Sequence, residues 1–291
     1  MPTKAKFDLF GQNVLVIAGK GGTGRTTLAR ILAKLASMSG RKVAVIAGTT
    51  GTHFTDTHDP LISFTSLEPG EVLISYLDQH GLSQLGKRLS SSGLASIIST
   101  AVPGIADLLV LAKIKQMEQA KVADLIIFDA PASGHFLRLI ATPMGLSNIA
   151  AAGPLQKQSQ EVLELIQDPA RLGIAMVTIP EETPVKETIE TVTQLKITSG
   201  LEPRALFINS LMPNIPQIAL KKLENTPLSA PYLAGKYTVA RNQTQMASKT
   251  SITNSLKLKA IEIPQVPTAD LDESDIENLA YAVSQQIEKI K

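Results

Sequence analysis

The residues with the clearest chemical potential form a short run near the N-terminus, GKGGTGRTT at positions 19–27. Gly19 and Gly24 have the spacing of a phosphate-binding loop, and Arg25 and Thr26 follow directly. Glycines let backbone N–H groups converge on phosphate oxygens, and the start of a following helix adds partial positive charge. We therefore predict a phosphate site in which the Thr26 hydroxyl holds Mg²⁺. The alternative is a glycine-rich turn that binds nothing.

Arginine stands at position 25, where such loops normally carry lysine. A guanidinium keeps its charge permanently and can clamp phosphate through two hydrogen bonds, but it is bulkier than an ammonium. Arg25 should therefore preserve nucleotide binding better than phosphate cleavage.

A second phosphate-facing segment follows at 124–143, DLIIFDAPASGHFLRLIATP. It opens with an apolar strand that ends in Asp129, and the carboxyl end of such a strand is where Mg²⁺ is expected in phosphate-loop proteins. An aspartate after an apolar strand is common, so Asp129 indicates a metal site only in combination with the glycine-rich loop. Together they predict catalytic roles for Arg25 and Asp129 and a metal site at Thr26 and Asp129.

The elements that must position these residues alternate between strands and helices. Apolar runs that are too short for helices and end at Gly, Pro or a polar residue predict strands buried in a parallel sheet. The six runs lie at 13–19, 42–48, 124–130, 173–180, 204–209 and 259–264. With helices between them, we predict an α/β fold with a doubly wound, mainly parallel sheet in a single domain over 1–291.

Three segments add detail to this alternation. Residues 66–121 contain helical patterns and no clear strand, which predicts a helical insertion. Ser274 and Glu277 have capping-box spacing and should start the last helix. The polar stretch 240–255 has little periodicity and is predicted to be mobile.

Several segments carry a resemblance to a known family. Lys20 gives the loop the deviant GKGGxG form of the class that includes signal-recognition, MinD and nitrogenase-like proteins, and DAPASGHFLRLIATP resembles the switch II segment of the ArsA family. This family contains arsenite-pump and tail-anchored-protein-targeting ATPases. The segments 177–190 and 207–213 match in the same order, and the segments 99–114 and 168–182 resemble a bacterial anion-transporting ATPase-like branch.

The resemblance implies a P-loop ATPase that binds ATP and Mg²⁺ and closes as a dimer. It also implies a catalytic role for Lys20, which would reach the partner's phosphates. It also places Asn209 near the adenine base. A solvated loop lysine is the alternative for Lys20. The resulting nucleotide-binding set is Gly19, Lys20, Gly21, Gly22, Thr23, Gly24, Arg25, Thr26, Thr27 and Asn209.

The sequence departs from the family in its ligand chemistry. The chain has no cysteine, so thiolate sites for arsenite, zinc or an iron–sulfur cluster are excluded. Thr49 stands near the position where the family usually has a water-positioning aspartate, and a hydroxyl is a poor substitute for a carboxylate. Asp56 or Asp59 could swing in from the loop, although solvated acids are the commoner outcome there.

Two histidine-containing features leave alternatives open. His53, Asp56, His58 and Asp59 could form a metal cluster, but the loop lacks an element to fix ligand geometry. His135 in the switch segment could report the γ-phosphate state or could cap the following helix.

Composition restricts the function classes. The net charge is +2, aromatic residues make up 4% and tryptophan is absent, so neither a strong field for nucleic acid nor stacking platforms are expected. No apolar run reaches the ~20 residues that span a bilayer, which makes a cytoplasmic location without direct membrane insertion the expectation. The seven methionines are dispersed, so a Met-rich client surface is not evident.

We therefore expect a nucleotide-switched dimeric ATPase, a homodimer or a heterodimer with a related ATPase, whose hydrolysis is slow or partner-dependent because of Arg25 and Thr49. Three alternatives remain: a non-hydrolysing ATP-binding subunit of a heterodimer, a ParA- or MinD-like positioning ATPase, and a metabolic ligase, for which no substrate pocket is identifiable. The sequence does not identify a protein client.

Overall fold

The computed structural model describes residues 8–48, 57–79, 104–149, 153–214, 230–268 and 270–290, together with positions 81, 83, 84, 88 and 221. Its strands are β1 (Val14–Gly19), β2 (Val43–Ala47), β3 (Ile62–Ser66), β4 (Leu125–Asp129), β5 (Leu172–Thr178), β6 (Ala205–Leu211) and β7 (Ala260–Pro264). Its helices are α1 (Arg25–Met38), α2 (Pro69–Gln79), α5 (Ile105–Gln119), α6 (Ser133–Ile149), α7 (Pro154–Gln167), α8 (Glu182–Ser199), α10 (Ala230–Leu256) and α11 (Glu273–Ile290).

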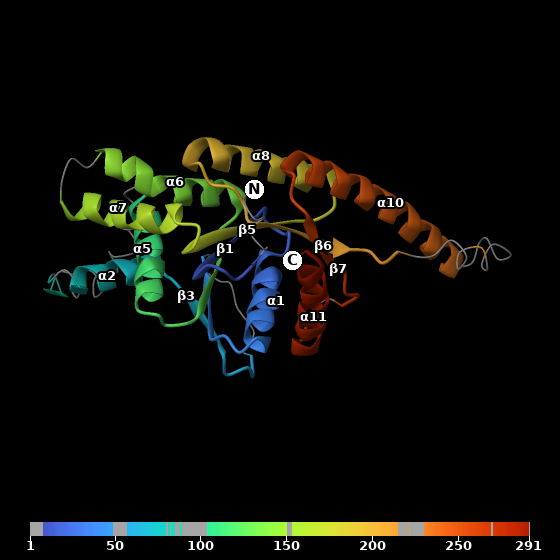
Figure 1. Cartoon of the computed structure of the whole chain (residues 1–291), viewed down its shortest axis with the longest axis horizontal. Coiled ribbons are helices and arrows are strands. Elements are labelled where there is room, and N and C mark those ends of the chain that lie inside the picture. Colours follow the sequence, from blue (N-terminus) through green and yellow to red (C-terminus); the bar gives the residue numbers. More distant parts are fainter. Residues whose placement is uncertain are drawn as a thin grey trace, which may run out of the picture.

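The strands form one parallel sheet in the order β3-β2-β4-β1-β5-β6-β7 (Figure 1). Helices α1 and α11 cover one face, while α5, α6, α7, α8 and α10 lie over the other, so the core consists of two apolar clusters separated by the sheet. This arrangement confirms the predicted doubly wound α/β fold. The central strand β1 pairs with β4 on one side and β5 on the other, which places the loops after these three strands next to each other.

The sequence missed one strand, β3, at the edge of the sheet. β1, β2, β4 and β5 are buried throughout, and the opposite edge strand β7 still buries Ile261 and Ile263, whereas the ISFTS sequence of β3 has no buried residue. An edge strand needs only one neighbour and does not have to be apolar on both faces. A search for continuous apolar runs therefore does not detect β3.

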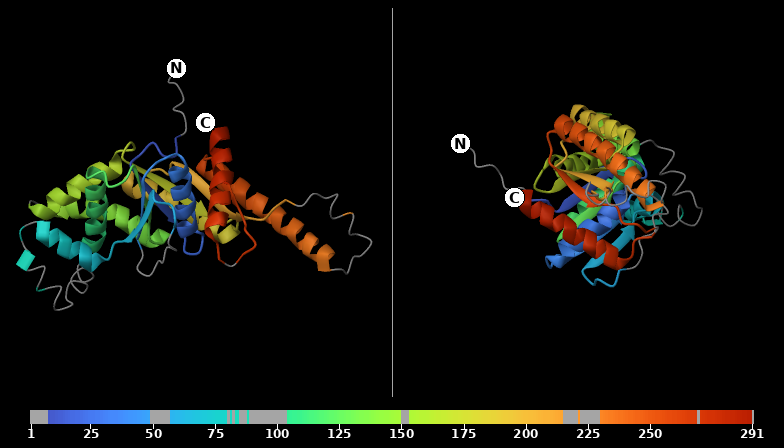
Figure 2. Two further views of the ribbon diagram at one scale, coloured as in Figure 1. Left: turned by 90° about the horizontal axis from the view of Figure 1, so that it is seen from below. Right: turned by 90° about the vertical axis from the view of Figure 1, so that its right-hand side faces the viewer.

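The prediction that residues 240–255 form a mobile segment is wrong, because these residues lie within α10, a helix of 27 residues. This part of the helix has no apolar stripe, and a polar contact of Gln245 joins it to the sheet instead. Gln245 Oε1 accepts a 2.9 Å hydrogen bond from Met212 N, just after β6. Ile252 and Ser248 are buried on the same helix. Figures 1 and 2 show the N-terminal part of α10 projecting away from the sheet.

The predicted insertion at 66–121 is helical where the structure describes it, in α2 and α5. Leu108, Leu111 and Ile114 of α5 are buried in the main apolar cluster against the sheet, so this helix is integral to the core. That 66–121 forms a subdomain stays a prediction.

The last helix, α11, begins one residue before the predicted cap at Ser274. The reciprocal capping bonds join Asp272 and Asp275 instead: each backbone N–H donates to the other side chain, at 3.2 and 2.8 Å. A capping box with two aspartates escaped the Ser/Glu pattern. Across the described ranges, no helix combines the length and apolarity needed to cross a membrane.

Candidate nucleotide site

The glycine-rich loop connects the carboxyl end of β1 to the N-terminus of α1, as its spacing predicts. Gly22 and Gly24 have φ angles of 80° and 90°, in the left-handed region that glycine adopts without steric cost. A Cβ atom on Gly21 or Gly22 would meet no atom within 4 Å, so the loop backbone faces open space. The first turn of α1 contains no acidic residue, which leaves its partial positive charge available to an anion.

The loop is fastened on the side of β5 and β6. The buried Thr23 hydroxyl donates a 2.8 Å hydrogen bond to the Lys20 carbonyl. Asn209 Nδ2 donates to the Thr23 carbonyl at 3.1 Å, and a Cβ on Gly24 would collide with the same amide. A Cβ on Gly19 would collide with the Val177 carbonyl of β5. Asn209, expected near adenine, therefore supports the loop backbone, a role that its segment did not suggest.

Thr26 and Asp129 meet on the opposite side of the loop. The Thr26 hydroxyl donates a 2.6 Å hydrogen bond to Asp129 Oδ2. The other carboxylate oxygen, Oδ1, is the one buried side-chain polar atom in the described part of the chain that has no hydrogen-bond partner. Burial raises the pKa of Asp129, against the opposing effects of Thr26 and of the Arg25 charge.

Arg25 reaches the segment that follows Asp129. Its guanidinium donates to the Ala130 carbonyl, directly after the end of β4. Burial lowers the pKa of Arg25, and the nearby Asp129 charge acts in the opposite direction. A guanidinium does not lose its proton in a folded protein, so the side chain remains a cation at neutral pH. Arg25 thus connects the loop to the start of the switch segment, and sequence reasoning had not foreseen this backbone partner.

Lys20 lies on the exposed side of the loop. Its ammonium forms a 2.8 Å ion pair with Glu187 of α8, and the two side chains are 48% and 32% exposed. The sequence did not single out Glu187, although it lies within the segment 177–190 that resembles the family. The pair is a contact within one chain.

His135 is joined to α5 rather than to the loop. His135 Nε2 lies 2.8 Å from Asp107 Oδ1, and Arg138 Nε donates to Asp107 Oδ2 at 3.2 Å. Asp107 is buried in the first turn of α5. The predicted switch helix α6 is therefore held to α5 by one carboxylate that contacts two of its side chains.

The acidic and histidine residues after β2 do not gather at the loop. His58 pairs with Glu273 at 3.1 Å. Asp59 accepts a 2.8 Å hydrogen bond from Ser37, near the end of α1 that lies farthest from the phosphate loop. Thr49, His53 and Asp56 lie outside the described residues. Within the ranges that are described, no three His, Asp or Glu residues form a possible metal-binding group.

The geometry fits Mg·ATP. A hydroxyl and a carboxylate supply the oxygen ligands that Mg²⁺ prefers, and Asp129 Oδ1 lacks the partner that a buried carboxylate oxygen requires. The open backbone at Gly21 and Gly22 can admit phosphate oxygens. The proposed ligands are Thr26 and Asp129 for the metal and the loop N–H groups for the phosphates.

A doubly wound parallel sheet whose central strand runs into a glycine-rich loop and helix, beside an aspartate on the neighbouring strand, defines the P-loop nucleoside-triphosphatase class. A family model described as "Anion-transporting ATPase" matches residues 77–158. This match and the relatives below show that the chain is similar to ArsA-type ATPases, which confirms the resemblance seen in the sequence.

The relatives are named as ATPases. "ATPase BagA" of Mycobacterium tuberculosis is 28% identical over an alignment of 211 positions, gaps included, that covers 64% of this chain and 62% of the relative. The "Arsenical pump-driving ATPase" of Escherichia coli is 26% identical over 202 residues, 68% of this chain and 34% of the relative. "ATPase ARSA1" of Chlamydomonas reinhardtii is 21% identical over an alignment of 330 positions, gaps included, that covers 92% of this chain and 42% of the relative. The chain thus matches less than two thirds of the length of each.

Proposed function

We propose that this chain binds Mg·ATP at the loop between β1 and α1 and hydrolyses it slowly, or with help from a partner, as a nucleotide-dependent switch. The observation that carries the proposal is the contact between Thr26 and Asp129 with the unpartnered Asp129 Oδ1 beside it. The names of the relatives support an ATPase. The bound Mg²⁺ would neutralise negative charge on the phosphate oxygens.

The chain's own residues would contribute binding and orientation. The loop N–H groups would donate to phosphate oxygens, and Thr23 and Asn209 keep that backbone in place. Arg25 would add positive charge at the terminal phosphates. Cleavage of ATP to ADP and phosphate also needs an oriented water molecule, and the position expected to orient it, Thr49, lies outside the described residues.

The contact of Arg25 with the Ala130 carbonyl supports slow hydrolysis. The guanidinium is tied to the protein and has to leave this carbonyl to clamp a phosphate. Lysine at this position would present a compact ammonium. We expect Arg25→Lys to raise kcat by about tenfold, which corresponds to ~1.4 kcal/mol of transition-state stabilisation, with little change in ATP affinity. Steady-state turnover and calorimetric ATP titration measure the two effects; a lower kcat in Arg25→Lys would show that arginine is the better catalyst here.

A dimer with Lys20 acting across the interface is the second part of the proposal. Lys20 must then leave Glu187, and an exposed pair of this kind is worth only about 0–1 kcal/mol. Lys20→Ala should reduce both turnover and ATP-dependent dimer formation, measured by light scattering. Lys186→Ala on the exposed face of α8 is the matched control. Parental turnover in Lys20→Ala would rule out the role across the interface.

A non-hydrolysing subunit of a heterodimer is the alternative that the tied Arg25 also favours. In that case the purified chain would bind ATP and release no phosphate until a related ATPase is added. Robust turnover by the chain alone would contradict it. A ParA- or MinD-like positioning ATPase has less support, because the net charge of +2 provides no strong field for nucleic acid or an anionic membrane.

The decisive experiment is purification from the native host with any bound chains, followed by ATP turnover with and without them. An intrinsic ATPase releases phosphate alone, a partner-dependent one does so only in the complex, and failure to bind Mg·ATP in either form would overturn the proposal. Chains that copurify in this preparation would identify a client. The cell fraction from which the protein is recovered would test the cytoplasmic location.

A further inference from the structure

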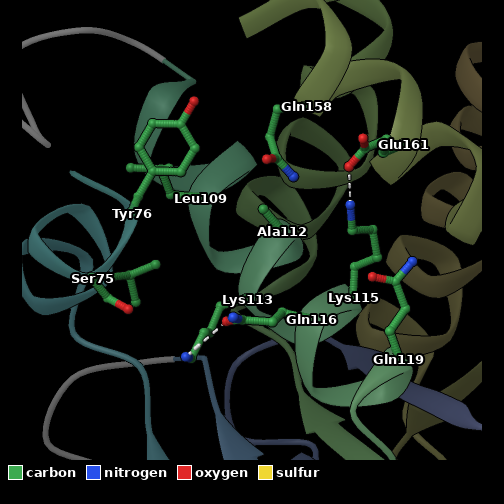
Figure 3. A pocket seen from close by; sticks show the side chains of 11 residues that line it. Ser75, Tyr76, Leu109, Ala112, Lys113, Lys115, Gln116, Gln119, Gln158 and Glu161 are labelled. Atoms are coloured by element: carbon green, nitrogen blue, oxygen red, sulfur yellow. Dashed lines mark hydrogen bonds and ion pairs between the residues drawn. The ribbon is translucent and has the colours of Figure 1, made fainter. Parts of the chain in front are cut away.

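A cavity of about 220 Å³ lies between α2, α5 and α7 (Figure 3). Leu109 and Ala112 of α5 line its middle, Tyr76 of α2 lies on one side, and Gln158 and Glu161 of α7 lie on another. None of its lining residues belongs to the phosphate loop or to the switch segment 129–143. It is therefore separate from the nucleotide site.

Two lysines line this cavity, and they differ in whether a carboxylate neutralises their charge. Lys115 is 6% exposed, and its ammonium forms an ion pair with Glu161. Lys113 donates a 2.9 Å hydrogen bond to Gln116 Oε1, and it makes no ion pair with any carboxylate in the described part of the chain. The lining thus carries one balanced pair and one cation whose charge is not compensated. A single negative charge is what this arrangement can accept.

The rest of the lining supplies apolar contact and neutral hydrogen-bonding groups. Val72, Leu109 and Ala112 are buried apolar side chains, and the amides of Gln116 and Gln158 can each donate and accept. Burial and the Glu161 charge raise the pKa of Tyr76, so its hydroxyl keeps its proton at neutral pH. An occupant would need an anionic end and a short apolar body.

The size and charge of the cavity narrow the ligand class. At ~30 Å³ per water-sized group, 220 Å³ corresponds to roughly seven such groups, so the cavity suits a small ligand. A divalent cation would need several oxygen ligands, whereas Glu161 is the only carboxylate in the described lining and is already paired.

We propose that the cavity between α2, α5 and α7 is a binding site for a small monocarboxylate, whose carboxylate pairs with Lys113 and whose apolar body packs on Leu109 and Ala112. The amide of Gln116, which already contacts Lys113, orients the ammonium toward the ligand. The site is independent of ATP.

The test uses the full chain without nucleotide and titrates it with butyrate, butyramide and butylamine by calorimetry and by ligand-observed NMR. Butyrate should bind at one site with an affinity near the millimolar range that so small a ligand can reach. Butyramide has a similar shape without the charge and should bind at least about tenfold more weakly. Butylamine should not bind. Equal affinity for butyrate and butyramide would overturn the pairing with Lys113, and no saturable butyrate binding would overturn the site.

Two variants locate the site. Lys113→Gln removes the cation, and Gln116→Glu places a carboxylate beside it, so each should weaken butyrate binding by about tenfold or more. Both change partly exposed side chains, and unchanged melting would show that they fold. Lys196→Gln removes the same charge from an exposed pair on α8 and should leave binding intact. Unchanged binding in Lys113→Gln, or equal loss in Lys196→Gln, would refute the assignment.

Discussion

The Thr26 hydroxyl and Asp129 Oδ2 are 2.6 Å apart, although 103 positions separate the two residues in the chain. The parallel pairing of β1 with β4 produces this contact, because Ile17 lies in register with Asp129 and α1 starts soon after β1 ends. Two residues predicted as metal ligands from separate motifs are thus brought together by the fold.

Replacing Asp129 with asparagine should weaken the Mg²⁺ dependence of ATP binding. Asparagine can still accept the Thr26 hydrogen bond, but it removes the charged oxygen at the Oδ1 position, so we expect apparent Mg²⁺ affinity to fall roughly 10–100-fold. ATP titrations at increasing Mg²⁺ measure the change. Asp124→Asn, at the other end of the β4 segment where Asp124 accepts from Lys42 N, is the control. A parental Mg²⁺ dependence in Asp129→Asn would place the metal elsewhere.

The same variant should be more stable than the parent when Mg²⁺ and ATP are absent. Burial raises the pKa of Asp129 above its ordinary value near 4, so the folded state binds the proton more tightly than the unfolded state. Stability of the parent therefore falls as pH rises from the ordinary pKa to the raised one, and stays low above that window. Asparagine does not ionise, so the variant does not lose stability in this way. Its free energy of unfolding at neutral pH should exceed that of the parent by about 1 kcal/mol or more.

Urea unfolding of the two proteins at about pH 4 and at neutral pH checks the window in which Asp129 ionises. The stability difference should shrink toward the acidic end. A difference that is the same at both pH values would mean that ionisation of Asp129 is not its cause.

A side chain at Gly24 should disrupt the loop. Its φ of 90° is strained for any L residue, at ~1–2 kcal/mol, and a Cβ would collide with the Asn209 amide. Gly24→Ala should therefore lower stability and abolish ATP binding. Adding Asn209→Ala removes the collision but leaves the strain, so the double variant should be more stable than the sum of the single effects.

Gly145→Ala is the matched control for Gly24, since it lies inside α6 with no atom near the new Cβ. It should be neutral or slightly stabilising. Additive effects of Gly24→Ala and Asn209→Ala, measured by urea unfolding, would contradict the proposed collision.

Loss of the Asp107 carboxylate should loosen the start of the switch helix. Asp107→Asn weakens the contacts to His135 and Arg138, whose side chains are 45% and 65% exposed, so the loss should be at most about 1 kcal/mol for each contact. Hydrogen exchange should become faster in the first two turns of α6 and stay unchanged in α8. Asp270→Asn, at an exposed position, should have no effect. Unchanged exchange in α6 would show that its own packing holds the helix.

Sequence reasoning was most successful where a residue acts through its immediate neighbours. The apolar run before Gly19, the glycines and the helix start at Arg25 are local signals, and the buried strands identified the parallel sheet. It failed for β3, whose edge position removes the need for a continuous apolar run, and for α10, where Gln245 forms polar contacts to the end of β6 that leave no periodic pattern.

The candidate site shows the same division. The loop residues and Asp129 follow from motif spacing, whereas the pairing of Lys20 with Glu187 depends on how α8 packs beside the loop. The support of Thr23 by Asn209 depends on the placement of β6. Such long-range contacts leave no spacing rule in the sequence.

The phosphate loop is held unequally on its two sides. Toward β5 and β6 it is fixed by contacts to its backbone, from Asn209 and from the close approach of Gly19 to Val177. Toward β4, among the residues that the structure describes, its hydrogen bonds come from the side chains of Arg25 and Thr26. Side-chain contacts can be exchanged for contacts to a ligand, while the backbone supports remain. If nucleotide binds here as proposed, the β5–β6 side would therefore act as a stationary frame, and the β4–α6 side would be the part that moves.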